Sequence, residues 1–173
     1  MKKVIVTTMI LLTALLVQAQ DSNKFTEFAK KRLVFDVEAG WATGSKTHLS
    51  QSIDLGVMMN RRVYAFASFG NDWLLYKQDG LQGYCHTGLL GGGLGFRWLY
   101  NEERRMSLDL RMKVEQSIGS KSMNCTVYDA GLRLRLGGKL LVPTIGIGFR
   151  HEHMHTSGLS HQNYPYISIG ISL

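Results

Sequence analysis

The sequence predicts an all-β fold, an eight-stranded antiparallel up-and-down transmembrane β-barrel, and three observations lead to this prediction. Polar and apolar residues alternate strictly in several stretches, as in MSLDLRMKVEQ from Met106 onward. A period of two is typical of a strand with one apolar and one polar face. Eight such runs follow one another, and their connections are short and long in turn. Short turns at one end and long loops at the other are typical of transmembrane barrels.

The chain divides into three expected segments. Residues 1–19 begin with two lysines, continue with an apolar core and end in small residues, so they predict a signal peptide that is cleaved near Ala19-Gln20. Residues 20–32 are polar and are expected to form a periplasmic lead-in, and residues 33–173 form the barrel. After the signal peptide no apolar stretch of about 18 residues follows, so the sequence predicts no transmembrane helix.

The eight expected strands are long enough to cross a bilayer when tilted, which takes about 9–11 residues. They comprise residues 33–42, 51–59, 63 to about 71 or as far as 76, 89–100, 106–118, 126–136, 140–150 and 164–173. Tight turns are expected at 60–62, 101–105 and 137–139. Longer connections, expected to be extracellular loops, are 43–50, 72–88, 119–125 and 151–163.

Glycine indicates which face of each strand lies inside. The glycines share their rows with charged residues, for example Gly56 with Asp54 and Gly95 with Arg97. An eight-stranded barrel is so narrow that side chains fill its interior, and small residues therefore belong there. A soluble lipocalin-like carrier is the alternative barrel, but it would hold bulky apolar residues inside and would have little use for glycine on a charged outer face. We therefore expect the apolar rows to face lipid.

The charged rows are then expected to line the lumen. They hold six acidic and six basic residues, namely Asp36, Glu38, Asp54, Asp109, Glu115, Asp129, Arg97, Arg111, Lys113, Arg133, Arg135 and Arg150. Buried charges must be paired, and the equal counts allow a network of ion pairs. Such a network either plugs the lumen or lines a porin-like conducting pore, and the small number of strands favours the plug.

The basic excess of the chain does not indicate a nucleic-acid partner. The formal net charge is +7, and the loss of Lys2 and Lys3 with the signal peptide lowers it by two. The remaining basic residues are scattered over alternating strands instead of clustering with aromatic residues for base stacking. No nucleic-acid partner and no cofactor are expected.

Residues 33–173 resemble the small eight-stranded outer-membrane proteins, the family that includes outer membrane protein X and the transmembrane domain of outer membrane protein A. The resemblance rests on the strand pattern and on the closing strand YPYISIGISL, whose last residue is Leu173 where such proteins usually carry an aromatic residue. It implies a monomeric barrel in the lipid of a bacterial outer membrane. It also implies a structural or surface-interaction role through the extracellular loops.

The expected loops contain every histidine of the chain, and these are His48, His86, His151, His153, His155 and His161. HEHMH places His151, His153 and His155 on one side of an extended segment, where neutral imidazoles suit Zn²⁺, Cu²⁺ or Ni²⁺. Polar filling of a loop is the alternative interpretation of these histidines.

The stretch FRHEHMHTSGL resembles the His-x-Ser segment of outer-membrane lipid A 3-O-deacylases, which are eight-stranded barrels with a Ser-His-Glu catalytic arrangement. The resemblance implies His155 as the base and Ser157 as the nucleophile. An activated serine also needs a group that orients the base, for which Glu152 is the neighbouring carboxylate. A lipid A-modifying hydrolase is therefore a second hypothesis.

Two cysteines occur in the chain, Cys85 and Cys125, and they fall in the second and third long loops. An exported protein permits a disulfide between them. Two free thiols are the alternative.

Overall fold

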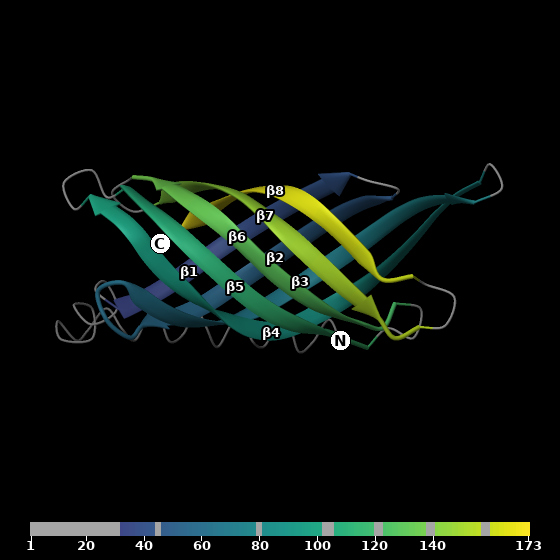
Figure 1. Cartoon of the computed structure of the whole chain (residues 1–173), viewed down its shortest axis with the longest axis horizontal. Coiled ribbons are helices and arrows are strands. Elements are labelled where there is room, and N and C mark those ends of the chain that lie inside the picture. The colour runs from purple at the N-terminus through teal and green to yellow at the C-terminus, as the bar shows by residue number, and fades with distance from the viewer. Residues whose placement is uncertain are drawn as a thin grey trace. The chain divides into compact units, whose positions relative to one another are not determined.

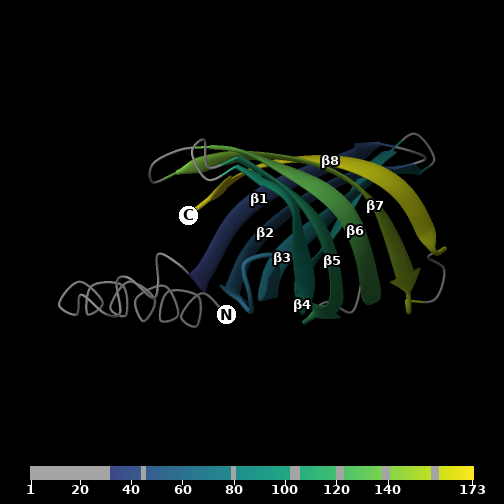
Figure 2. The same ribbon diagram turned by 60° about the vertical axis from the view of Figure 1, so that its left-hand side comes forward.

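The predicted fold class is confirmed by the computed structural model, which describes residues 32–43, 46–78, 81–101, 106–119, 123–137, 141–156 and 160–173. The strands are β1 (Leu33–Thr43), β2 (Thr47–Met58), β3 (Val63–Gln78), β4 (Leu81–Asn101), β5 (Met106–Ile118), β6 (Cys125–Leu136), β7 (Val142–Met154) and β8 (Gln162–Ser172). They form one closed barrel in which sequence neighbours pair and β8 returns to pair with β1 (Figure 1). The oblique course of the strands around the barrel is clear in Figure 2.

The barrel has two different ends. At one end, which we call the short-turn end, β2 is joined to β3, β4 to β5 and β6 to β7, and at the opposite loop end the other four connections occur. The predicted alternation of short and long connections is wrong, because only three residues separate β1 from β2 and two separate β3 from β4 at the loop end, against four, four and five at the short-turn end. Within the described residues no helix has both the length and the apolar character needed to cross a membrane.

Several strands extend farther toward the loop end than the sequence predicted. β3 and β4 stay paired as far as Gln78 and Leu81, so the predicted loop 72–88 is mostly a long hairpin that projects beyond the other strands (Figure 1). β2 also starts early, β6 starts at Cys125, β7 runs to Met154 and β8 begins at Gln162, which shortens the other three expected loops as well. The polar side chains of these segments suggested loops, but backbone pairing satisfies N–H and C=O groups whatever the side chains are.

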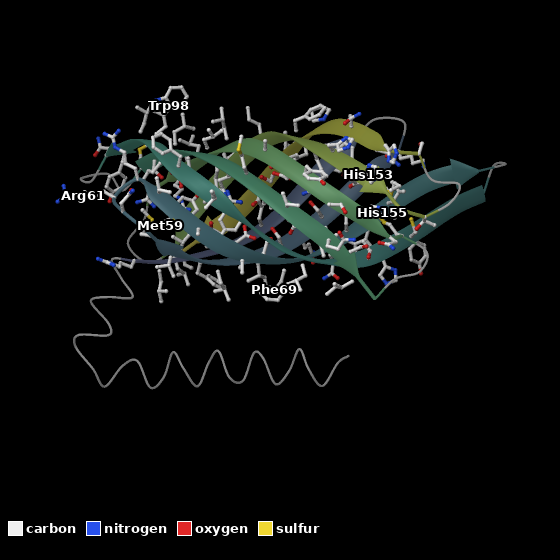
Figure 3. All side chains as sticks on the ribbon, turned by 60° about the horizontal axis from the view of Figure 1, so that its bottom comes forward. Met59, Arg61, Phe69, Trp98, His153 and His155 are labelled. Atoms are coloured by element: carbon white, nitrogen blue, oxygen red, sulfur yellow. The ribbon has the colours of Figure 1, made fainter. Side chains whose placement is uncertain are left out.

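The outer surface of the barrel carries large apolar side chains. Ile169 is 68% exposed, and Leu94 and Ile147 are each 57% exposed. Figure 3 shows Phe69 and Trp98 pointing away from the barrel on opposite sides. Monomeric soluble proteins rarely expose apolar surface over such a continuous area. This arrangement is the reverse of a soluble carrier, which needs its apolar side chains inside.

Glycine at position 95 lets an aromatic ring lie flat inside the barrel. Gly95 pairs with Tyr64 across β3 and β4, and a Cβ atom at position 95 would lie 2.0 Å from Cζ of that ring. Tyr64 is completely buried, and its hydroxyl donates a hydrogen bond of 3.1 Å to Oδ2 of Asp109. An added methyl group must therefore displace the ring and disturb this hydrogen bond.

Gly95→Ala is expected to lower the free energy of unfolding by about 1–3 kcal/mol, the usual cost of overpacking a core. Urea unfolding of the barrel in lipid vesicles measures the loss. Gly88→Ala is the matched control on the same strand, because a Cβ there first meets the flexible side chain of Ile118, at 3.3 Å. Equal losses in the two variants would contradict the assigned role of Tyr64.

Candidate functional site

The interior of the barrel is a network of ion pairs centred on Asp36. This carboxylate lies 2.8 Å from Nη1 of Arg133, 3.2 Å from Nη1 of Arg135 and 3.6 Å from Nη1 of Arg111. Each of these arginines also reaches a second carboxylate. The inner group of connected charges has four members of each sign, Arg97, Arg111, Arg133, Arg135, Asp36, Glu38, Asp54 and Asp109.

A second set of charges continues this network toward the loop end. Lys113 Nζ lies 3.1 Å from Glu115, and the Ser68 hydroxyl lies between Glu115 and Asp54, 2.7 and 2.6 Å from their oxygens. Farther along, Arg150 Nε donates to Asp129 over 3.1 Å. Ion pairs therefore occur along much of the lumen.

The structure places all twelve predicted lumenal residues inside the barrel and in ion pairs. Sequence reasoning missed three further buried groups, His48, Asp72 and Glu152, because it assigned them to loops. The strand period was the signal that could have found them. His48 lies six residues from Asp54 and Glu152 lies two from Arg150, and even spacings keep side chains on one face of a strand.

An apolar cluster lies at each end of the charged interior. At the short-turn end is the cluster Val34, Met58, Tyr64 and Phe66, on which the Arg111 guanidinium stacks 4.1 Å from the Phe66 ring centre. At the loop end is a second cluster, which we call the loop-end cluster, formed by Leu74, Leu89, Met123, Cys125, Val127 and Met154. Most of the lumenal ion pairs therefore lie between these two clusters.

Little free space remains among the lumenal charges. A cavity of about 20 Å³ lies between Glu38, Arg111, Lys113, Asp129 and Arg133 and their neighbours. A volume of that order holds about one water molecule. The arrangement can hold the barrel rigid and closed, and it leaves no room there for a hydrated ion.

The histidines predicted as metal ligands lie on the outer face of the loop end, where Figure 3 shows His153 and His155. The His153 ring stacks on His161 at 4.2 Å and meets His155 at 4.9 Å, whereas His151 is farther away at 6.5 Å. The structure therefore groups His153 with His155 and His161 more closely than with His151. A metal site at His151, His153 and His155 stays a prediction.

The structure separates His155 from Glu152, two residues of the hydrolase hypothesis, because Glu152 on β7 faces inward and His155, directly after β7, is exposed. Ser157 lies outside the described residues. His155 is exposed, and its Nε2 lies 2.8 Å from the Thr126 hydroxyl. Glu152 is completely buried in the lumen, where the Tyr164 hydroxyl donates to it, so it does not orient His155.

Cys85 and Cys125 are free thiols in the structure. Cys125 belongs to the loop-end cluster and Cys85 packs against it, with its Sγ 3.9 Å from Sδ of Met123. Of the two alternatives for these cysteines, the structure has the reduced one.

The fold and its interior define the class of the protein, an eight-stranded antiparallel β-barrel that is apolar outside and ion-paired inside. No protein-family model matches the chain, and no curated protein matches it. One similar solved structure is a de novo designed transmembrane β-barrel, with 14% sequence identity and a TM-score of 0.45 over 82% of this chain and 93% of that one.

Proposed function

We propose that the protein is a plugged transmembrane barrel of a bacterial outer membrane, with a structural or surface-interaction role through its loop end. The observation that carries the proposal is the polarity of the barrel, whose apolar side chains face outward while its charges pair inside. Lipid is the solvent that favours such an exterior, and a closed barrel leaves no unpaired strand edge in it. The predicted signal peptide, residues 1–19, lies outside the described residues and agrees with export.

The filled lumen argues against conduction. An ion that crossed the barrel would have to displace ion pairs that hold buried arginines such as Arg111, which is 7% exposed. The protein is therefore proposed to act through its surface, not through a channel. The loop end offers that surface, since the β3–β4 hairpin projects there with Tyr84 69% exposed.

Membrane fractionation of cells that express the full chain tests the proposal. We expect the protein in the outer-membrane fraction, with a band that shifts between unboiled and boiled samples on an SDS gel, because a closed barrel resists detergent. We also expect no ion conductance when the purified barrel is added to a planar lipid bilayer. A soluble protein without the shift would overturn the membrane assignment, and steady single-channel currents would overturn the plug.

A further inference from the structure

Three ligand-bearing side chains meet in the lumen near the loop end. His48, Asp72 and Glu152 come from β2, β3 and β7, and their relative exposures are 3%, 0% and 0%. One ligand atom from each lies within 4.8 Å of those from the other two. β7 is not a neighbour of β2 or β3 in the barrel, so this group forms across the lumen.

The group holds polar atoms without hydrogen-bond partners. Both carboxylate oxygens of Asp72, Nδ1 of His48 and Oε2 of Glu152 are buried and have no hydrogen-bond partner among the described residues. The Asp72 carboxylate is ion-paired with Arg150, but their closest atoms are 3.6 Å apart, which is too far for a hydrogen bond. A buried donor or acceptor left unpaired costs about 1–3 kcal/mol, and more when it is charged. Within the described residues, these atoms therefore have no hydrogen-bond partner.

The surrounding contacts orient His48 as a ligand. Its Nε2 lies 2.9 Å from Oε1 of Gln162, an acceptor that holds the ring proton at Nε2 and leaves the lone pair on Nδ1. That Nδ1 faces Glu152 across 3.5 Å, too far for an ordinary N–H···O bond. The Tyr164 ring stacks on the imidazole at 4.1 Å and fixes its plane. Metal-binding histidines usually have such a partner on the second ring nitrogen.

We propose that His48 Nδ1, a carboxylate oxygen of Asp72 and one of Glu152 bind a single first-row divalent cation, Zn²⁺ being the best match. One imidazole and two carboxylates are ligands that Zn²⁺ accepts, and three protein ligands leave a fourth position for water. Two carboxylates and one divalent ion are together neutral, which is the charge balance that a buried site needs. This inference does not depend on the membrane location.

The cation would join three strands across the lumen. Leu74 and Met154 are the next inward-facing residues after Asp72 and Glu152, and both belong to the loop-end cluster. That cluster lies between the site and the solvent at the loop end. A bound ion therefore acts as a structural cross-link that stabilises the folded barrel by mass action, rather than as an exposed catalytic centre.

Zinc titration of the folded full chain in detergent micelles, after treatment with EDTA, tests the proposal. The readouts are bound zinc per protein, affinity against a chromophoric chelator, and the temperature of unfolding. We expect one Zn²⁺ per barrel and a higher unfolding temperature with zinc. His48→Gln and Asp72→Asn should each weaken binding by at least about tenfold, the range known for disturbed metal sites.

The control variant carries asparagine at His153, His155 and His161, and it should bind zinc as the unaltered chain does. Asp72→Asn also serves as a folding control. Without metal it removes one of two buried carboxylates that lie side by side, while Arg150 keeps its ion pair with Asp129, so this variant should unfold at the same temperature or higher. If the triple variant lost zinc binding while His48→Gln kept it, the proposal would be overturned and the ion would be assigned to the outer histidines. The proposal would also be overturned if the unaltered chain bound no zinc. Water or a shared proton between the carboxylates of Asp72 and Glu152 would then take the place of the ion.

Discussion

Asp36→Ala is expected to lower the free energy of unfolding by about 3–5 kcal/mol, the usual cost of removing one partner from a buried ion pair. Asp36 is 1% exposed and contacts Arg111, Arg133 and Arg135. The inner group to which it belongs has equal numbers of positive and negative side chains. Its loss leaves one positive charge in the lumen without a counter-charge, and the closed barrel gives water little access to that charge.

Urea unfolding in lipid vesicles, followed by tryptophan fluorescence, measures this loss. The matched control is the double variant Asp36→Leu/Arg133→Met, which removes one charge of each sign and keeps side chains of similar volume. Replacing a buried pair by apolar residues is often neutral, so the double variant should recover most of the lost stability. A single variant as stable as the unaltered chain would show that the lumenal pairs do not stabilise the barrel.

Ile169→Arg is the second change with a large expected effect, about 2–4 kcal/mol of stability in a bilayer, the cost of a lipid-facing arginine at the midplane. Ile169 is 68% exposed on β8, and its cross-strand neighbours are Ala39 and Ile145. It lies near the middle of the apolar outer rows. An arginine there must either enter the hydrocarbon or bend its side chain toward a distant interface.

The same unfolding experiment in vesicles measures the effect of Ile169→Arg. Gln51→Arg provides the control, since Gln51 is also exposed on an outward row but lies near the loop end of β2. Near an interface the cost falls to about 0–1 kcal/mol. If both arginine variants were equally stable, the outer surface would not be in contact with lipid.

The faces of the strands could be predicted because one short-range rule determines them. Asp54 and Gly56 face inward in the structure while Ile53 and Val57 face outward, as the period of two requires. The ends of the strands could not be predicted in this way. His48 and Asp72 continue the inward rows of β2 and β3, but whether a polar segment stays paired depends on the strand across from it, which a local pattern does not contain.

The individual ion pairs of the lumen could not be predicted from the sequence, for a related reason. Asp36 meets Arg133 and Arg135 across 97 and 99 positions of the chain. Their meeting depends on the register of every strand pair around the barrel, and a shift in any one pair would move them apart. Composition could establish that the lumen is balanced in charge, whereas the particular partners follow only from the closed structure.

The pairing of β8 with β1 has a consequence for the order in which the chain folds. Asp36 lies opposite Ser172, and the Leu173 N–H donates to the Phe35 carbonyl over 2.9 Å, so closure joins the first strand to the last. Contacts of such large sequence separation form late and slowly. Until they form, a sheet of these strands stays open with free edges at β1 and β8, and free edges are templates for aggregation. We therefore expect the chain to be most prone to aggregation before closure, and the pairing of β8 with β1 to remove that risk.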